Sequence, residues 1–168
     1  MKFKLTKQII IFASLIVGLL VIDMMSKVFT NGIDHTRIIP KVIAFESVHN
    51  EGIAFSWLSG AGIWLIVLVG ILTVGAITAW WFFGRKNTFA SVAFSFFVAG
   101  AIGNLYDRIA YGHVRDFIKF DFWQSFAIFN FADICLTSGT VMLMIYFIFV
   151  ASKKKKEKTT ENIDEKTT

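Results

Sequence analysis

The residues of this chain that could do chemistry are concentrated between two long apolar runs. The stretches Gly103–Arg108, Gly112–Phe117 and Phe129–Asp133 together hold three aspartates, two asparagines and two arginines. Polar groups at membrane depth are costly, so they are rare there unless they carry function. We therefore expect the chemistry of this protein in the part of the chain that these three stretches occupy.

Asp116 and Asp133 are the two carboxylates that could act together. Asp133 lies inside an apolar run and should face the interior of a helix bundle, and the short connection after Asp116 lets the two converge. Two close carboxylates cannot both ionise cheaply, so such a pair shares a proton. One member can then activate water while the other protonates a leaving amine, which is what peptide hydrolysis needs. Two unrelated polar residues at helix ends are the alternative.

Metal and cofactor chemistry fit the sequence poorly. His35, His49 and His113 do not form a His-Glu-x-x-His pattern, and we expect no metal and no cofactor. The single cysteine, Cys135, has no partner for an internal disulfide and no metal-ligand spacing. It is expected to be a small core residue of the last helix.

Four apolar segments must position these polar residues. The chain has 168 residues, of which 55% are hydrophobic, and each segment is close to the roughly 20 residues that a spanning helix needs. The segments are Gln8–Phe29, Ala61–Phe83, Thr88–Tyr106 and Phe126–Val150. The sequence therefore predicts an all-α membrane protein, with one four-helix domain over residues 1–151. Residues 152–168, rich in lysine, are expected to form a disordered cytoplasmic tail.

Basic residues indicate the orientation of the four spans. The clusters that would share one side are Lys2, Lys4 and Lys7, then Arg85 and Lys86, then Lys153 to Lys156. The positive-inside rule then places both termini in the cytoplasm. The net charge of +5 comes largely from the tail, and the chain shows no motif for binding nucleic acid. The remaining outer cations have acidic neighbours in the sequence, which suggests ion pairs.

The long segment between the first two spans is expected to form a small β-rich extracytoplasmic platform, at about residues 31–60. Asn31-Gly32 indicates a turn, and Pro40 allows an edge strand at best. At its end, Gly52 permits a close backbone approach, and Asn50 can donate and accept hydrogen bonds at once. A simple turn before the second helix is the alternative. The aromatic segment Asp116–Trp123 is expected to skim the membrane surface or re-enter it.

Polar residues also lie near the outer ends of the first and third helices. Asp23 and Lys27 are four residues apart and share a helix face, so they form either a membrane-edge ion pair or a support for the site. Asn104 precedes Asp107-Arg108 by one turn, and Arg108 could fix a loop. Glycines of the second helix, and small residues of the third, are expected to let helices approach closely.

Five motifs, taken together and in order, resemble those of lipoprotein signal peptidase (signal peptidase II). They are Asp23-x-x-Ser26-Lys27, Asn50-x-Gly52-x-Ala54-Phe55, Gly103-Asn104-x-x-Asp107-Arg108, Gly112-x-Val114-x-Asp116-Phe117 and Phe129-Asn130-x-Ala132-Asp133. The resemblance covers essentially everything except the tail. It implies an aspartic endopeptidase of the bacterial inner membrane, which cleaves diacylglyceryl-modified prolipoproteins just before the lipidated cysteine.

The resemblance also implies roles for individual residues. Asp116 and Asp133 would be the catalytic pair, and a cleft between helices two to four would hold the acyl chains. The residues expected to bind substrate or support the site are Asp23, Lys27, Asn50, Gly52, Asn104, Arg108 and Asn130. The implied partners are prolipoprotein substrates and membrane lipid.

Two other functions are alternatives to this one. A small four-helix proton-coupled transporter would need one essential carboxylate, such as Asp23 or Asp133, and would have little need for Asp116. A non-catalytic membrane assembly factor would tolerate asparagine at both aspartates of the pair. Neither alternative gives a reason for the clustering of asparagines and aspartates near the outer boundary.

Overall fold

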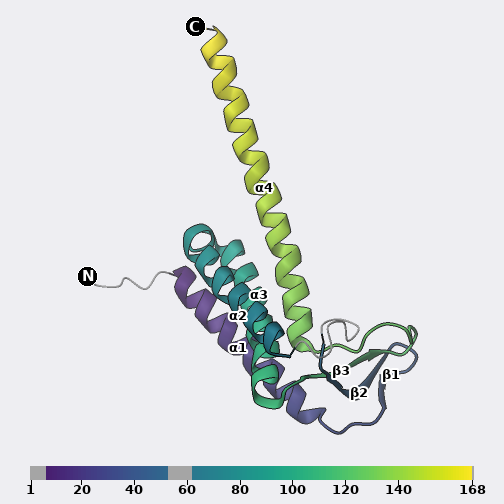
Figure 1. The fold of residues 1–168 in the computed structure, drawn as a ribbon. Coiled ribbons are helices and arrows are strands. Elements are labelled where there is room, and N and C mark those ends of the chain that lie inside the picture. The colour runs from purple at the N-terminus through teal and green to yellow at the C-terminus, as the bar shows by residue number, and fades with distance from the viewer. Residues whose placement is uncertain (1–6, 53–61, 168) are drawn as a thin grey trace.

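The computed structural model describes residues 7–52 and 62–167, and the side chains among them up to Val150 (Figure 1). The predicted motif residues Ala54 and Phe55 lie outside the described part. In chain order the elements are α1 (Lys7–Phe29), β1 (Thr36–Ile39), β2 (Ile43–Asn50), α2 (Gly62–Ala79), the π-helical turn η2 (Trp80–Gly84), α3 (Thr88–Tyr111), β3 (Val114–Phe120) and α4 (Phe131–Thr167).

Four helical segments in the described part of the chain are long and apolar enough to cross a membrane, as the sequence predicts. They are Lys7–Phe29, Gly62–Gly84, Thr88–Tyr111 and Phe131–Val150, with lengths of 23, 23, 24 and 20 residues. α3 is the central helix: it packs against α1, α2 and α4, and most of it is buried. The other three spans expose large apolar side chains such as Val17, Trp64 and Ile148, which suits contact with lipid.

Small residues bring α3 and α4 into close contact, but the prediction for the second helix was wrong. At Gly70 and Gly75 a Cβ would meet no atom within 4 Å, so these glycines of α2 make no close approach. At Gly100 of α3, a Cβ would overlap the main chain of α4 at Ala132 and lie 2.8 Å from the Leu136 nitrogen. The fit between α3 and α4 therefore positions the start of α4, where Asn130 and Asp133 lie.

The predicted platform is a three-stranded antiparallel sheet in the order β1-β2-β3. β1 and β2 come from the expected segment, with the turn at Pro40 between them. β3 was not predicted: the segment expected to skim the membrane instead pairs with β2, with Val48 opposite Asp116 and Asn50 opposite Val114. This pairing joins segments that are far apart in the sequence, and it places Asn50 beside Asp116.

The last helix begins later and ends later than the sequence suggests. The connection after β3 continues to Phe129, which pairs with Ile118 in an isolated bridge, so α4 begins only at Phe131. α4 then continues to Thr167, through residues for which we expected a disordered tail. The chain has no glycine or proline after Gly139, and lysine and glutamate are good helix formers, so no residue of the tail forces the helix to end.

Candidate active site

The start of α4 is a capping box made of two residues that were predicted to belong to the site. The Asn130 side chain accepts a hydrogen bond from the Asp133 backbone N–H (3.0 Å), and the Asp133 carboxylate accepts one from the Asn130 backbone N–H (3.1 Å). This reciprocal pattern satisfies N–H groups that a helix start otherwise leaves unpaired. The positive end of the helix dipole also favours a carboxylate at this place. The fold of the helix start therefore fixes where Asp133 lies.

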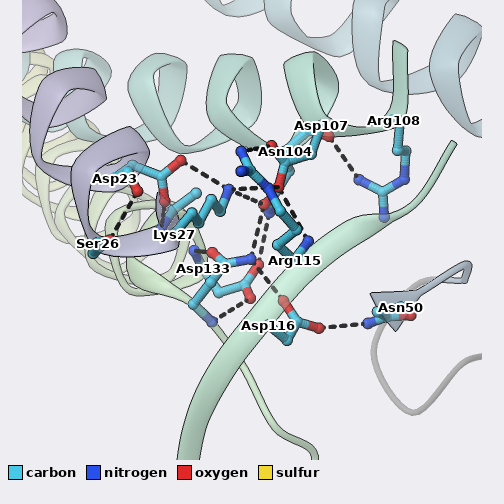
Figure 2. A network of polar contacts seen from close by, with 12 residues as sticks. Asp23, Ser26, Lys27, Asn50, Asn104, Asp107, Arg108, Arg115, Asp116 and Asp133 are labelled. Atoms are coloured by element: carbon cyan, nitrogen blue, oxygen red, sulfur yellow. Dashed lines mark hydrogen bonds and ion pairs between the residues drawn. The ribbon is translucent and has the colours of Figure 1, made fainter. Parts of the chain in front are cut away.

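Asp116, on β3, is joined to the same helix start. Its side chain is 2% exposed, and the Asn130 amide donates to its Oδ1 at 2.7 Å. Asn50, the last residue of β2, donates to the other oxygen at 2.9 Å, as Figure 2 shows. Because Asn130 bonds to both Asp116 and Asp133, the two carboxylates that the sequence analysis paired are brought together. A strand, a neighbouring strand and a helix start meet at this point.

Asn104 of α3 links this pair to a buried cation. Its Oδ1 accepts hydrogen bonds from Lys27 Nζ (3.4 Å) and from the Asn130 amide (3.0 Å). Its own amide donates to Asp133 Oδ1 at 2.7 Å. A lysine ammonium can only donate, so Asn104 must present its oxygen to Lys27 and its nitrogen to Asp133. The cation therefore sets the direction of the hydrogen bonds that reach the carboxylates.

Lys27 lies within an ion cluster that the sequence showed only in part. The expected pair with Asp23 is present, at 2.8 Å, but Lys27 is 1% exposed and does not extend toward the membrane edge. Lys27 also pairs with Asp107 at 3.2 Å. Asp23 in turn accepts the Ala132 backbone N–H of α4 at 2.9 Å. The cluster thus holds α1, α3 and α4 together directly beside the two carboxylates.

Asp107 and Arg115 are the residues of this cluster that the predicted site left out. Asp107 is fully buried and pairs with Arg115 at 2.7 Å as well as with Lys27. Asp107 follows Asn104 by three residues, so both lie on one helix face. That spacing was the available signal for Asp107. Arg115 was expected only to pair with an acidic neighbour, and the folded chain shows that this neighbour is Asp107 on α3.

Arg108 fixes the loop after β2, as the sequence suggested. Its Nη2 donates to the Gly52 carbonyl at 2.7 Å, and its Nη1 donates to the Asn104 carbonyl at 3.4 Å. The Gly52 N–H in turn donates to the Asn50 side chain at 3.0 Å. Within the described residues, Arg108 Nε is buried and has no hydrogen-bond partner.

A cavity of about 680 Å³ opens beside the two carboxylates. Leu65, Leu68, Val69 and Leu72 of α2, together with residues of α3, α4 and the aromatic connection before α4, form its apolar wall. The polar residues that line it are Asn50, Asn104, Arg108, Asp116, Asp133, Thr137 and Ser138. A volume of this size is typical of cavities that bind small molecules. Its apolar wall continues from α2, α3 and α4 to a polar end that contains both aspartates.

The environment of Asp116 favours a shared proton. Burial raises the pKa of Asp116, and the nearby charge of Asp133 raises it further, to about 7, although hydrogen bonds from Asn50 and Asn130 act in the opposite direction. The Asp116 carboxyl can therefore hold a proton at a pH close to neutral. This is the state that a pair of carboxylates needs in order to act as acid and base together.

The other residues considered for chemistry lie elsewhere. His35 contacts Glu46 at 3.0 Å on the sheet, and His49 and His113 stack on each other with ring centres 4.0 Å apart. Across residues 7–52 and 62–150, no group of three or more histidine, cysteine, aspartate and glutamate side chains could hold a metal ion. Cys135 is 1% exposed and packs in the core of the bundle, as expected.

Comparison with known proteins gives one consistent family. A family model described as signal peptidase (SPase) II matches residues 15–149. A lipoprotein signal peptidase of Pseudomonas fluorescens (strain Pf0-1) is 40% identical over 137 residues, which cover 75% of this chain and 80% of the relative. One of Pseudoalteromonas translucida (strain TAC 125) is 36% identical over 149 residues, which cover 83% and 89%.

Solved structures agree with the sequence comparison. Two structures described as bacterial membrane enzymes are each 30% identical to this chain. One superposes with a TM-score of 0.80 over 85% of this chain and 90% of its own length. The other has a TM-score of 0.74 over 81% and 91%. The arrangement of four helices and a small sheet is therefore one that solved membrane enzymes share.

The raised pKa of Asp116 makes a prediction about stability. An acid whose pKa is higher in the folded than in the unfolded chain stabilises the fold at low pH, and this contribution is lost as the pH rises toward about 7. Asp116→Asn cannot titrate, so its stability relative to the wild type should rise by roughly 2–3 kcal/mol between pH 5 and pH 8. Unfolding of both proteins in detergent across this range measures the difference.

The matched control for this prediction is Asp34→Asn, which alters an exposed aspartate in the connection before β1. Its stability relative to the wild type should not change with pH. An Asp116→Asn variant whose relative stability is the same at pH 5 and pH 8 would show that Asp116 titrates normally.

Proposed function

The chain belongs to the signal peptidase II family, and on that premise we propose that it cleaves prolipoproteins with Asp116 and Asp133 as an aspartic dyad. Membership makes it a bacterial multi-pass membrane peptidase that removes prolipoprotein signal peptides. The proposed substrate carries diacylglycerol on its lipobox cysteine, and the bond cut lies just before that cysteine. The observation that carries this proposal is the joint attachment of both carboxylates to Asn130 at the polar end of an apolar cavity.

The proposed reaction needs one proton and one water at the pair. One carboxylate removes a proton from water, which attacks the scissile carbonyl, while the carboxylic acid of the pair donates a hydrogen bond to that carbonyl oxygen. Collapse of the tetrahedral intermediate breaks the C–N bond, and a proton of the pair passes to the leaving amine. The roles of acid and base are assigned to the pair and not to either aspartate alone. A pKa of about 7 at Asp116 supports a singly protonated pair near neutral pH.

The surrounding amides suit this chemistry. Asn50, Asn104 and Asn130 all donate to the carboxylates, which holds the two aspartates in place without removing their ability to exchange a proton. Arg108 lines the cavity, and its guanidinium is held by the Gly52 and Asn104 carbonyls. We propose that this guanidinium also donates to a backbone carbonyl of the bound substrate, where it would help to orient the scissile bond.

The cavity suits a substrate that remains partly in the bilayer. Its apolar wall would accept acyl chains, and its polar end would receive the peptide bond next to the lipidated cysteine. Both termini are proposed to lie in the cytoplasm. The chain enters α1 and turns between α2 and α3 at one end of the bundle, while the sheet lies at the other end (Figure 1). Arg85 and Lys86 occupy that turn, which fits a cytoplasmic position.

The dyad is tested by cleavage of a diacylglyceryl-modified lipobox peptide by the purified protein in detergent. Asp116→Asn and Asp133→Asn should each lower kcat by about 10³-fold or more, because either change removes one partner of the acid–base pair. Asp121→Asn is the matched control, since that aspartate follows β3, pairs with the exposed Arg37 at 3.1 Å and does not line the cavity.

The control should cleave at the wild-type rate just before the cysteine, and all variants should remain folded at pH 5. Normal cleavage by either dyad variant would refute the dyad. If no variant and no wild-type protein cuts the peptide, proton-coupled uptake in liposomes tests the transporter alternative instead.

The proposal that the cavity binds acyl chains is tested by placing a bulky side chain of α4 in it. Thr137 lines the cavity, whereas Thr140, one turn farther along, does not line it and is exposed. Thr137→Trp should raise KM for the lipidated peptide by about tenfold, because the ring occupies volume that the acyl chains need, while Thr140→Trp should leave KM within about twofold. Substrates with shorter acyl chains should recover part of the loss. Equal KM values for the two tryptophan variants would place the acyl chains elsewhere.

A further inference from the structure

We propose that Arg115 is a positioning residue for the reaction, acting through Asp107 to fix the start of β3 and thereby the location of Asp116. This inference rests on the proposed catalytic role of Asp116. Arg115 is the residue directly before Asp116, so whatever holds its main chain also limits the movement of the carboxylate that follows.

Asp107 holds both the side chain and the main chain of Arg115. Asp107 Oδ1 accepts a hydrogen bond from Arg115 Nη2 at 2.7 Å. The other oxygen accepts the Arg115 backbone N–H at 3.1 Å and its Nε at 3.4 Å. Guanidinium and carboxylate thus meet through two parallel contacts, which fix orientation as well as distance. The added backbone contact ties the start of β3 to a fixed position on α3.

The pair of Asp107 and Arg115 is largely buried. Asp107 is fully buried, and the Arg115 side chain is 12% exposed. The Arg115 guanidinium lies 4.4 Å from the centre of the Tyr111 ring, which is a favourable cation–π contact. Separating a buried carboxylate from its cation is strongly unfavourable. The contact between α3 and β3 should therefore stay closed while substrate enters and leaves.

Lys27 connects this contact to the rest of the site. It shares Asp107 with Arg115, at 3.2 Å, and also contacts Asp23 and Asn104. Two cations, Lys27 and Arg115, thus balance two buried anions. β3 is held through Asp107 in the same cluster that orients the Asn104 amide toward Asp133. Asp116 and Asp133 consequently take their positions from one set of charges.

The chain offers a matched ion pair on the same strand. Lys119 of β3 contacts Glu46 of β2 at 2.7 Å, the same length as the contact between Arg115 and Asp107, and its side chain is 19% exposed. Loss of this pair removes an ion pair from β3 without touching Asp107. Lys119→Leu is therefore the control for any general effect of weakening the sheet.

The experiment measures kcat, KM and melting temperature with the diacylglyceryl-modified peptide for Arg115→Leu, Arg115→Lys and Lys119→Leu. Arg115→Leu should lower kcat by about tenfold or more with KM changed less than about twofold, since a small displacement of a catalytic group affects the chemical step most. Arg115→Lys keeps the positive charge but cannot make two parallel contacts with Asp107, so its kcat should lie between those of the wild type and Arg115→Leu. Lys119→Leu should keep both constants within about twofold.

The double variant Asp107→Asn/Arg115→Leu separates position from charge. This variant restores the charge balance of the cluster but not the two parallel contacts between guanidinium and carboxylate. If Arg115 acts by positioning, kcat should therefore stay low. Recovery of wild-type kcat would show that only charge matters and would overturn the proposal, as would an equal loss in Lys119→Leu. If folded Arg115→Leu has the wild-type kcat while Asp116→Asn is inactive, the positioning role of Arg115 is overturned and the dyad stands. If Asp116→Asn is itself active, the dyad is refuted.

Discussion

The structure depends on the neutralisation of charges buried at the end of the helix bundle that lies next to the sheet. Lys27 is 1% exposed and contacts Asp23 and Asp107, and these contacts join α1 to α3. A buried ion left without its partner would be strongly destabilising, so the helices can pack here only in the arrangement that completes the cluster. Since Lys27 also orients Asn104, the same requirement determines which groups face Asp133.

Several interactions at this site serve both folding and the proposed chemistry. Asn130 and Asp133 form the cap of α4, so any loss of the cap would also displace a proposed catalytic carboxylate. Asn50 ends β2 and bonds to Asp116 on β3, so the sheet register is set beside the same pair. The close contact at Gly100 sets the separation of α3 and α4. A pair of aspartates can be held this precisely because helix start, strand and helix contact all converge on it.

The sequence predicted the parts of this arrangement that leave local signals. Runs of apolar residues predicted all four spans, and the ordered motifs indicated the family and the pairing of Asp116 with Asp133. β3 was missed because its partner strand is far away in the sequence. The role of Arg115 was missed because its partner Asp107, only eight residues earlier, lies on a different element, α3. Glycines were interpreted equally in α2 and α3, although only the fold shows which of them meet a neighbouring backbone.

We propose that Asp116, beside the carboxylate of Asp133, holds a proton at pH values just below 7. Infrared spectroscopy of the protein in detergent measures this directly, through the stretching band of a protonated carboxyl group. If Asp116 holds this proton, the wild type should show such a band at pH 6 and lose it as the pH is raised through about 7, and Asp116→Asn should lack it at pH 6. A wild-type spectrum at pH 6 without this band, or a band that persists unchanged in Asp116→Asn, would contradict protonation of Asp116.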